Sequence, residues 1–168
     1  FSENTAGIGD FGLTALYTFY SAQELRHRFL LNATVNAPTG SIDRTMDGMR
    51  LEYPMQLGSG SFEIAPGITY LGQNRDWAAG AELLPRIRFG NNNNGYRLGN
   101  QYHAKAWLAR RLTDWLSAST KVEGEVTEKI HGLDTELDPQ DEPTKDVNVQ
   151  GGKRIGLSLA LNMFAPSG

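Results

Sequence analysis

The residue types best suited to chemistry lie first in an acidic stretch, "DTELDPQDEP", at residues 134–143. Its alternate carboxylates resemble the oxygen ligands of a calcium-binding loop. An EF-hand is excluded because Pro139 replaces the glycine that its sharp turn needs and Lys145 stands where the bidentate glutamate belongs. We therefore expect a solvated acidic loop here, with a looser divalent-cation site as the alternative.

A second candidate is a group of three methionines, Met46, Met49 and Met55. Thioethers are soft ligands that suit copper, but no histidine or cysteine accompanies them, so packing of a loop is the expected role. The chain contains no cysteine at all, which excludes disulfides and thiolate metal sites. His103 and His131 do not stand at a metal-ligand spacing. We expect neither a metal nor a cofactor.

The third candidate is a set of charged residues, Lys121, Glu123 and Glu125, that would share one face of a strand. Two carboxylates beside a lysine could act in acid–base catalysis. No other catalytic arrangement accompanies them, since Ser117 and Ser119 have no histidine in pattern. We therefore expect that the protein is not an enzyme.

The elements that would position these residues are strands. In "WAAGAELLPRIRFG", residues 77–90, the odd positions up to 89 are all apolar and the even positions hold every charge. A period of two indicates a strand with one apolar and one charged face. The pattern recurs and predicts seven strands and no helix, at residues 9–20, 27–37, 61–72, 77–90, 101–112, 115–127 and 153–164.

The connections between these strands alternate in length. Short turns are expected at 21–26, 73–76 and 113–114, and long loops at 38–60, 91–100 and 128–150. Strict alternation predicts an up-and-down antiparallel meander with all long loops at one end. The whole chain, residues 1–168, is expected to be a single β-barrel domain or a segment of one.

Composition limits the classes of protein. The net charge of −3 gives no case for nucleic-acid binding. No run of about 18 apolar residues exists, so no transmembrane helix is expected. The mean hydropathy of −0.42 would suit a soluble protein. Transmembrane barrels can have an equally low mean hydropathy, because apolar and polar residues alternate along their strands.

Three features favour a transmembrane β-barrel over a soluble all-β domain. The strands are about ten residues long, enough to cross a bilayer when tilted. The long loops alternate with short turns, as in outer-membrane barrels. Aromatic residues gather at both ends of the apolar faces, as they do at the two membrane interfaces. These expected interface residues are Phe11, Tyr17, Phe19, Phe29, Phe62, Tyr70, Trp77, Phe89, Tyr102 and Trp115.

The charged faces would then line a lumen. Seven basic residues, four acidic residues and one histidine predict either a polar wall cross-linked by ion pairs or a mildly anion-preferring pore. The expected pore-lining residues are Arg28, Glu63, Glu82, Arg86, Arg88, His103, Lys105, Arg111, Lys121, Glu123, Glu125 and Arg154.

One hairpin makes a sharper prediction. A four-residue turn at 73–76 pairs Tyr70 with Ala79, and Phe62 with Ile87, which keeps apolar residues on one face. Pro66 and Pro85 then lie almost opposite each other, and each removes a backbone donor. We expect a bulge or weakened pairing at the two prolines.

Several segments of the chain resemble a known family of outer-membrane barrels, which is named for the meta-pathway of phenol degradation. Many members of this family are labelled transporters. The pair "YPMQLGSG" and "PGITYLGQ" is the most specific, and "NAPTGSID", "GYRLGNQY", "AWLARRLTDWLSAS" and "GGKRIGLSLALNMFAPSG" extend the resemblance over nearly the whole chain. Members of the family are longer, and single-chain bacterial barrels have even strand numbers. We therefore expect this chain to be part of a longer protein, with several chains completing one barrel as the alternative.

The resemblance implies a location in the outer membrane of a Gram-negative bacterium. It also implies transport of small, aromatic solutes, and the charged faces described above add anionic solutes as the alternative. Expected partners are membrane lipid, the solute, and further segments or copies of the same protein, but no nucleic acid. The alternatives are a structural scaffold in an envelope or extracellular assembly and a soluble all-β binding module.

Overall fold

The computed structural model describes residues 6–22 and 26–163, and its main feature is one antiparallel sheet of seven long strands. The middle of the predicted 21–26 turn and Phe164 lie outside these residues. None of the described residues forms a helix long and apolar enough to cross a membrane. The long strands are β1 (Phe11–Ala22), β2 (His27–Ala37), β5 (Phe62–Gln73), β6 (Trp77–Phe89), β8 (Gln101–Arg111), β9 (Leu116–Thr127) and β11 (Gly152–Met163).

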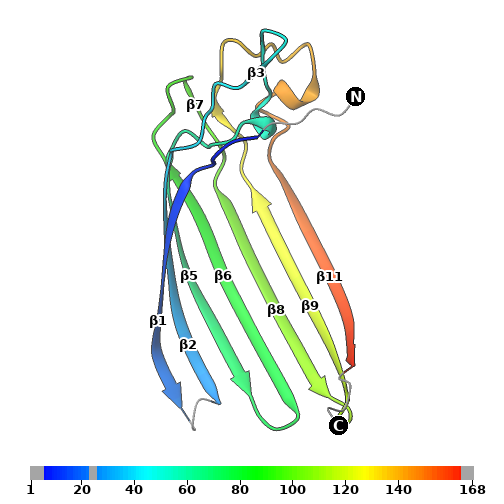
Figure 1. The fold of residues 1–168 in the computed structure, drawn as a ribbon. Coiled ribbons are helices and arrows are strands. Elements are labelled where there is room, and N and C mark those ends of the chain that lie inside the picture. The colour runs from blue at the N-terminus through cyan, green and yellow to red at the C-terminus, as the bar shows by residue number, and fades with distance from the viewer. Residues whose placement is uncertain (1–5, 23–25, 164–168) are drawn as a thin grey trace.

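The seven strands follow each other in space in the order of the sequence, β1-β2-β5-β6-β8-β9-β11. Each pairs antiparallel with the next, so the sheet is an up-and-down meander (Figure 1). The three long connections lie together at one end of the strands and the short turns at the other. The all-β, antiparallel, seven-stranded prediction is therefore confirmed.

The sheet is open within the described residues, because β1 and β11 form its two edges and do not pair with each other. Each edge strand is 12 residues long and exposed over almost its whole length.

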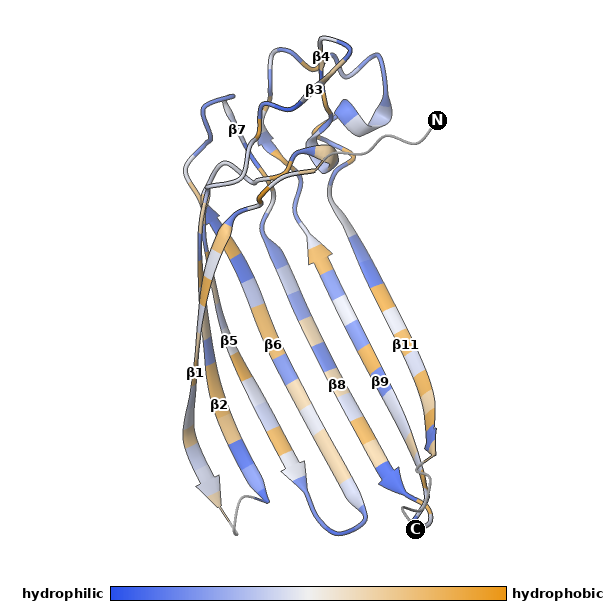
Figure 2. Ribbon diagram, in the orientation of Figure 1, coloured by the Kyte–Doolittle hydropathy of each residue, from blue (hydrophilic) through white to orange (hydrophobic). Residues whose placement is uncertain are grey.

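Hydrophilic and hydrophobic residues alternate along the strands (Figure 2), so the two faces of the sheet differ in character. The face that carries Glu63, Glu82 and Lys105 is called the inner face here, and the face that carries Leu83 and Phe89 the outer face. On β5, the inner Glu63 is 4% exposed whereas outer residues on the same strand are mostly exposed. This burial comes from the arginines that pair with Glu63 and from the long connections at this end of the sheet.

The strand β1 contains an irregularity that moves a tyrosine to the outer face. Thr18 pairs with Leu30, but Tyr20 pairs with Phe29, so Phe19 is the extra residue of a β-bulge. Simple alternation from Tyr17 and Phe19 would place Tyr20 on the polar face. The bulge places it beside Phe29, with ring centroids 5.9 Å apart, and Phe19 lies 6.1 Å from the same ring.

The predicted register of the β5–β6 hairpin is wrong by two residues. Tyr70 pairs with Ala81 and Phe62 with Phe89, and the last pair is Gln73–Ala78, so the turn is centred one residue later in the chain than expected. The cause is Asn74, whose side-chain oxygen accepts hydrogen bonds from the backbone N–H groups of Asp76 (2.9 Å) and Trp77 (2.8 Å). A shift of two residues preserves the faces, which is why the hydropathy pattern did not detect it.

The weakened pairing at the two prolines is confirmed. Pairing of β5 with β6 stops after Ile64–Ile87 and resumes at Ile68–Leu83 in the same register. That register places Pro66 directly opposite Pro85, so two backbone donors are missing from one position of the ladder. The result is an interruption and not a bulge, and the ladders on the far sides of both strands continue.

The long connections contain short elements that the sequence pattern did not predict. They are β3 (Thr45–Met46), β4 (Met49–Arg50), a 3-10 turn (Tyr53–Met55), β7 (Tyr96–Arg97), β10 (His131–Gly132) and a second 3-10 turn (Pro143–Lys145). Residues 38–61, 90–100 and 128–151 form a layer over one end of the sheet, which we call the cap. Its core consists of Tyr53, Tyr96, Ile130 and Leu137.

Candidate functional site

The inner face of the sheet gathers the charged residues that the sequence assigned to a lumen. The register places all twelve on this one face, in rows that run across the strands. One row joins Glu82, Lys105 and Glu123, and a neighbouring row joins His103, Glu125 and Arg154. Alternation along each strand is the local cause, because every second side chain points to the same side.

The most buried ion pair of the inner face lies near the cap. Glu63 is paired with two arginines, through Arg86 Nε at 3.2 Å and Arg88 Nε at 3.0 Å. The side chains of Glu63 and Arg88 are only 5% and 7% exposed, whereas that of Arg86 is 44% exposed. The Arg88 contact is ionic, since Nε lacks hydrogen-bond geometry, and the guanidinium also donates to the carbonyl of Gly99. Arg88 therefore joins the wall to the cap, and Arg86 remains accessible.

The middle of the inner face is cross-linked in the same way. Lys105 Nζ lies 2.7 Å from Glu82 Oε1, and the hydroxyl of Thr69 donates to Glu82 Oε2 at 3.1 Å. Asn32 donates in turn to the Thr69 hydroxyl at 2.9 Å. One polar chain thus crosses β2, β5, β6 and β8.

The later strands carry more accessible cations. Lys121 is paired with Glu123 at 2.8 Å and Arg154 with Glu125 at 3.2 Å. The Arg154 side chain is 76% exposed. Arg111 binds Asp76 and Asp114 of the short turns, so it lies at the turn end of the wall. Basic side chains therefore remain available on a wall whose acidic groups are all paired.

A recess interrupts the charged rows. Leu84, Arg86, Gln101, His103 and Glu125 line a volume of about 240 Å³ on the inner face. Leu84 is an apolar residue among polar ones, and it lies over Gly67, where a Cβ would come within 2.7 Å of the leucine. The recess combines one apolar side chain, one accessible arginine and one histidine.

The predicted interface aromatics that belong to strands lie on the outer face, with Phe19 at the bulge and Trp115 in a short turn. Phe29 and Tyr70 pack together with ring centroids 5.0 Å apart. The other eight are exposed, from Trp77 at 40% to Phe11 at 67%. Six lie near the turn end, namely Tyr17, Phe19, Phe29, Tyr70, Trp77 and Trp115, and four near the cap, namely Phe11, Phe62, Phe89 and Tyr102.

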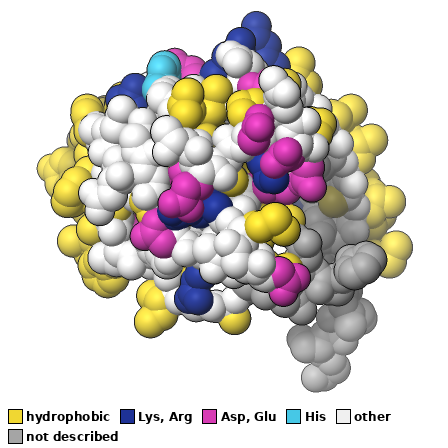
Figure 3. All heavy atoms as spheres, turned by 90° about the horizontal axis from the view of Figure 1, so that it is seen from above, with side chains coloured by type: hydrophobic (Ala, Val, Ile, Leu, Met, Phe, Trp, Pro, Cys, Tyr) yellow, Lys and Arg dark blue, Asp and Glu magenta, His cyan; other side chains and the backbone are white. Residues whose placement is uncertain are grey.

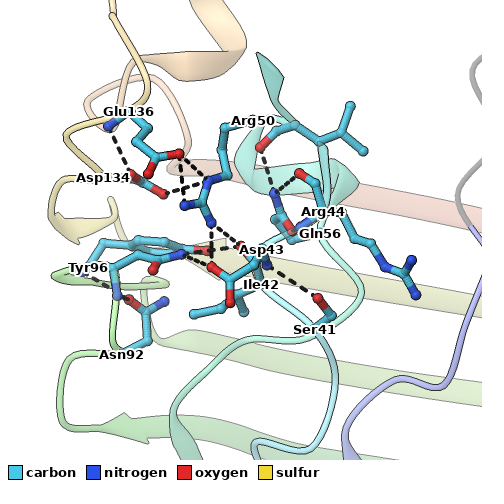
Figure 4. Close-up of polar contacts among 12 residues, drawn as sticks. Ser41, Ile42, Asp43, Arg44, Arg50, Gln56, Asn92, Tyr96, Asp134 and Glu136 are labelled. Carbon is cyan, nitrogen blue, oxygen red and sulfur yellow. Dashed lines mark hydrogen bonds and ion pairs between the residues drawn. The ribbon is translucent and has the colours of Figure 1, made fainter. Parts of the chain in front are cut away.

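The cap is organised around Arg50, which the sequence did not single out (Figure 4). Its guanidinium binds Asp43, the carbonyl of Ile42 at 3.1 Å and Glu136 at 2.9 Å. Asp134 lies 3.8 Å away. Burial would lower the pKa of Arg50, but the hydrogen bonds to Asp43 and Glu136 outweigh it and raise that pKa.

The acidic stretch at 134–143 is thus only partly the solvated loop that was expected. Asp134 is 3% exposed, and its backbone N–H donates to the hydroxyl of Tyr53 at 3.0 Å. Tyr53 packs edge-on against Tyr96 with centroids 4.7 Å apart. Burial raises the pKa of Tyr96 to about 12, so its hydroxyl is protonated at neutral pH. No local pattern marked these residues, because their contacts join loops far apart in sequence.

Viewed from above, the cap covers the end of the sheet (Figure 3). Charged side chains lie towards its middle and hydrophobic side chains project around much of its rim. Beneath it, Tyr53, Arg88, Gly99, Thr127 and Gln150 help to line a recess of about 160 Å³. Residues of the cap and of the sheet therefore line this recess together.

The cap should loosen in acid. Hydrogen bonds from Asn94 and Arg50 lower the pKa of Asp43 below its ordinary value of 3.8. A depressed pKa means that Asp43 stabilises the cap above that ordinary value and that this contribution is lost as the pH falls through the folded pKa. Proteolysis of residues 38–60 should therefore accelerate as the pH falls below about 4, modestly because the Asp43 side chain is 65% exposed.

The matched control for this acid effect is the Arg50→Gln protein. Its loop should already be cleaved faster at pH 7, and it should respond less to acid because one of the two hydrogen-bond partners of Asp43, Arg50, is gone. Equal cleavage rates for both proteins at every pH would contradict the role given to Arg50.

A family profile described as "Putative MetA-pathway of phenol degradation" matches residues 1–153. A search of the curated proteins found no match. The profile spans six of the seven long strands, the cap and every predicted pore-lining residue except Arg154.

Proposed function

The chain belongs to the family described as "Putative MetA-pathway of phenol degradation", and from that premise we propose that it forms part of the wall of an outer-membrane β-barrel that passes small solutes. The outer face would meet lipid and the inner face would line the solute path. The proposal has two parts, a membrane location and a transport role, and each has separate support.

The membrane location is supported chiefly by the pattern of burial, in which apolar side chains are exposed and charged side chains are buried, the reverse of a water-soluble protein. Large hydrophobic side chains are exposed along the outer face, for example Leu83 at 57% and Leu159 at 77%, while charged residues such as Glu63 and Arg88 are buried on the inner face. Water-soluble monomers rarely expose apolar surface of this extent. A bilayer would cover it without cost, since alternating apolar-out and polar-in strands are the design of outer-membrane barrels.

Aromatic side chains support the same orientation. They gather at both ends of the outer face, at the levels where a bilayer's two interfaces would lie. Arg110 also lies on the outer face, with its guanidinium carbon 4.9 Å from the centre of the Trp77 ring. This cation–π contact near a strand end suits an interface, where the charge can reach water.

The open edges β1 and β11 require partners in a membrane. Each presents unpaired backbone groups over 12 residues, and such groups cost several kcal/mol apiece in hydrocarbon. Further strands of the same protein or other copies of the chain would supply the missing hydrogen bonds.

The transport role rests on the accessible cations of the inner face. All four acidic residues of the predicted wall are paired, and Glu63 alone serves two arginines. Seven basic residues against four acidic ones leave a positive balance on this wall. An excess of accessible positive charge favours anions over cations in a pore. The family's description makes small aromatic acids the first solutes to test.

Removal of accessible cations should reduce anion preference. The reconstituted protein with Arg86→Gln, Lys121→Gln and Arg154→Gln should show a reversal potential in a salt gradient that moves towards that of an unselective pore. Arg88 is excluded from the variant because it is buried against Glu63 and holds the cap. Planar-bilayer recording under asymmetric salt provides the measurement.

The control for the selectivity experiment is Lys153→Gln, on the outer face, which should leave the reversal potential unchanged. An unchanged potential in the triple variant would contradict the assignment of the inner face to a solute path. An absence of any conductance in the unaltered protein would favour the alternative of a structural scaffold.

A further inference from the structure

The outer face carries a hollow at the turn end of β2, β5 and β6. It has a volume of about 330 Å³ and is lined by Arg26, His27, Tyr70, Gly72, Trp77 and Ala79, with polar groups of the β5–β6 turn at its end. It lies at the level of the lower aromatic residues, where the proposed membrane interface would be. The hollow therefore differs from the solute path on the inner face.

Aromatic rings form the two walls of the hollow and small residues its floor. On one side, His27 Nδ1 lies 2.9 Å from the Tyr70 hydroxyl and the two rings are stacked. On the other side stands Trp77. Gly72 lies between them, and a Cβ there would meet the Tyr70 hydroxyl at 2.4 Å, so the tyrosine covers part of the floor. The hollow is thus the space between the His27–Tyr70 pair and the Trp77 ring.

The charge around the hollow is positive. Arg26 lines it and is exposed, and Arg110 lies over the Trp77 ring. None of the described residues that line the hollow is acidic. Asp76 of the neighbouring turn is paired with Arg111, whose side chain is on the inner face. An anionic group in the hollow would thus lie near Arg26, and none of the described lining residues would repel it with a carboxylate.

A long apolar groove leads away from the hollow towards the middle of the sheet. It has a volume of about 480 Å³, shares Tyr70 with the hollow, and is floored by Ala81, Ala104 and Ala106. Ile68, Leu83 and Val122 form its sides. The alanines are small, so neighbouring side chains stand above them as two ridges.

We propose that the hollow and the groove together bind one glycerophospholipid with an anionic headgroup. The phosphate would lie in the hollow beside Arg26, with Arg110 close by against the Trp77 ring, and an acyl chain would lie along the alanine floor of the groove. This inference rests on the proposed membrane location, because a lipid in this position has its chains along the outer face. Juxtaposed cations and an apolar channel are the combination that a phospholipid requires.

A second copy of the chain fits the surface less well. A symmetric contact through this hollow would bring Arg26 and Arg110 of one copy towards the same arginines of the other. Like charges placed together oppose association. A phospholipid instead brings the opposite charge to the arginines.

Trp77 provides a direct probe of the hollow. Trp107→Phe and Trp115→Phe leave it as the single tryptophan, since the chain contains three. Dibrominated phosphatidylglycerol, titrated into the protein in neutral detergent, should quench Trp77 saturably at a low mole fraction of lipid. Brominated phosphatidylcholine should require more lipid, because its headgroup has no net charge.

Two variants test the two halves of the site. Arg26→Gln with Arg110→Gln should raise the amount of phosphatidylglycerol needed for half-quenching about tenfold, because each arginine near an anionic headgroup contributes to its affinity. Ala81→Phe should raise it by obstructing the groove. The matched controls are Lys129→Gln with Lys153→Gln at the other end of the sheet and Ala15→Phe on β1, and neither should change it.

Flotation of the protein with phosphatidylcholine vesicles is measured first, and it separates the two claims. Failure to float would contradict the proposed membrane location itself. Flotation together with quenching that rises in proportion to the lipid fraction, equally in all variants, would overturn only the lipid site. Competition by inorganic phosphate alone would overturn it in favour of a free-anion site, and loss of quenching with dimer formation would overturn it in favour of a second copy.

Discussion

Replacement of Glu63 by glutamine is expected to lower the free energy of unfolding by about 3–5 kcal/mol, because it leaves the charge of a buried arginine without a partner. Arg88 is 7% exposed on its side chain and lies 3.0 Å from Glu63. The second partner, Arg86, can turn to water and contributes less. Urea unfolding of the protein in lipid vesicles, followed by tryptophan fluorescence, measures the loss.

The control for Glu63 is Glu125→Gln, which removes a carboxylate from the same face. Its partner Arg154 is 76% exposed, so the expected loss is below about 1 kcal/mol. The double variant Glu63→Gln with Arg88→Gln should recover part of the stability, because the uncompensated charge is then absent. Equal losses for the Glu63 and Glu125 variants would show that burial of the pair does not stabilise the wall.

Replacement of Leu83 by arginine is expected to destabilise the protein in a bilayer by about 2–4 kcal/mol. Leu83 lies mid-strand on the outer face and is 57% exposed, so the proposed orientation places it in hydrocarbon. On the surface of a water-soluble protein the same change would be nearly neutral. Unfolding in vesicles of defined composition gives the value.

The neighbouring residue provides the matched control. Leu84→Arg introduces the same charge on the inner face, where the lumen can hydrate it, so its cost should be smaller. If Leu83→Arg were neutral, or if both variants cost the same, the outer face would not be in contact with lipid.

The sequence predicted the strands and their faces because alternation is a local property. In β2 both predicted ends agree with the structure, and every residue predicted to line a lumen lies on one face. The same argument explains the errors. The register at Asn74 depends on side-chain hydrogen bonds within a turn, and the bulge at Phe19 depends on packing against Phe29. Hydropathy is nearly insensitive to both.

The cap could not be predicted for a different reason. Arg50 and Glu136 are 86 residues apart in sequence, and Tyr53 and Asp134 are 81 apart. Their contacts join irregular loops, which have no periodic pattern to read. The acidic stretch suggested a metal-cation site or a solvated loop. In the structure, Asp134 and Glu136 instead lie beside the guanidinium of Arg50.

The central claim is that the sheet stands in a membrane with its outer face towards lipid and its inner face towards water. The chain contains no cysteine, so single cysteines can be introduced along one strand and its neighbour without a background. Labelling in intact vesicles by a charged, water-soluble maleimide tests the claim most directly. The positions to compare are Ala81, Leu83 and Ile87 on the outer face with Leu84, Arg86 and Gln101 on the inner face.

We expect the charged reagent to label the inner positions and to leave the outer positions unlabelled, because the thiolate forms in water and the reagent does not enter hydrocarbon. Detergent-free labelling of inner and outer positions at equal rates by the charged reagent would contradict the membrane orientation on which the proposed function depends.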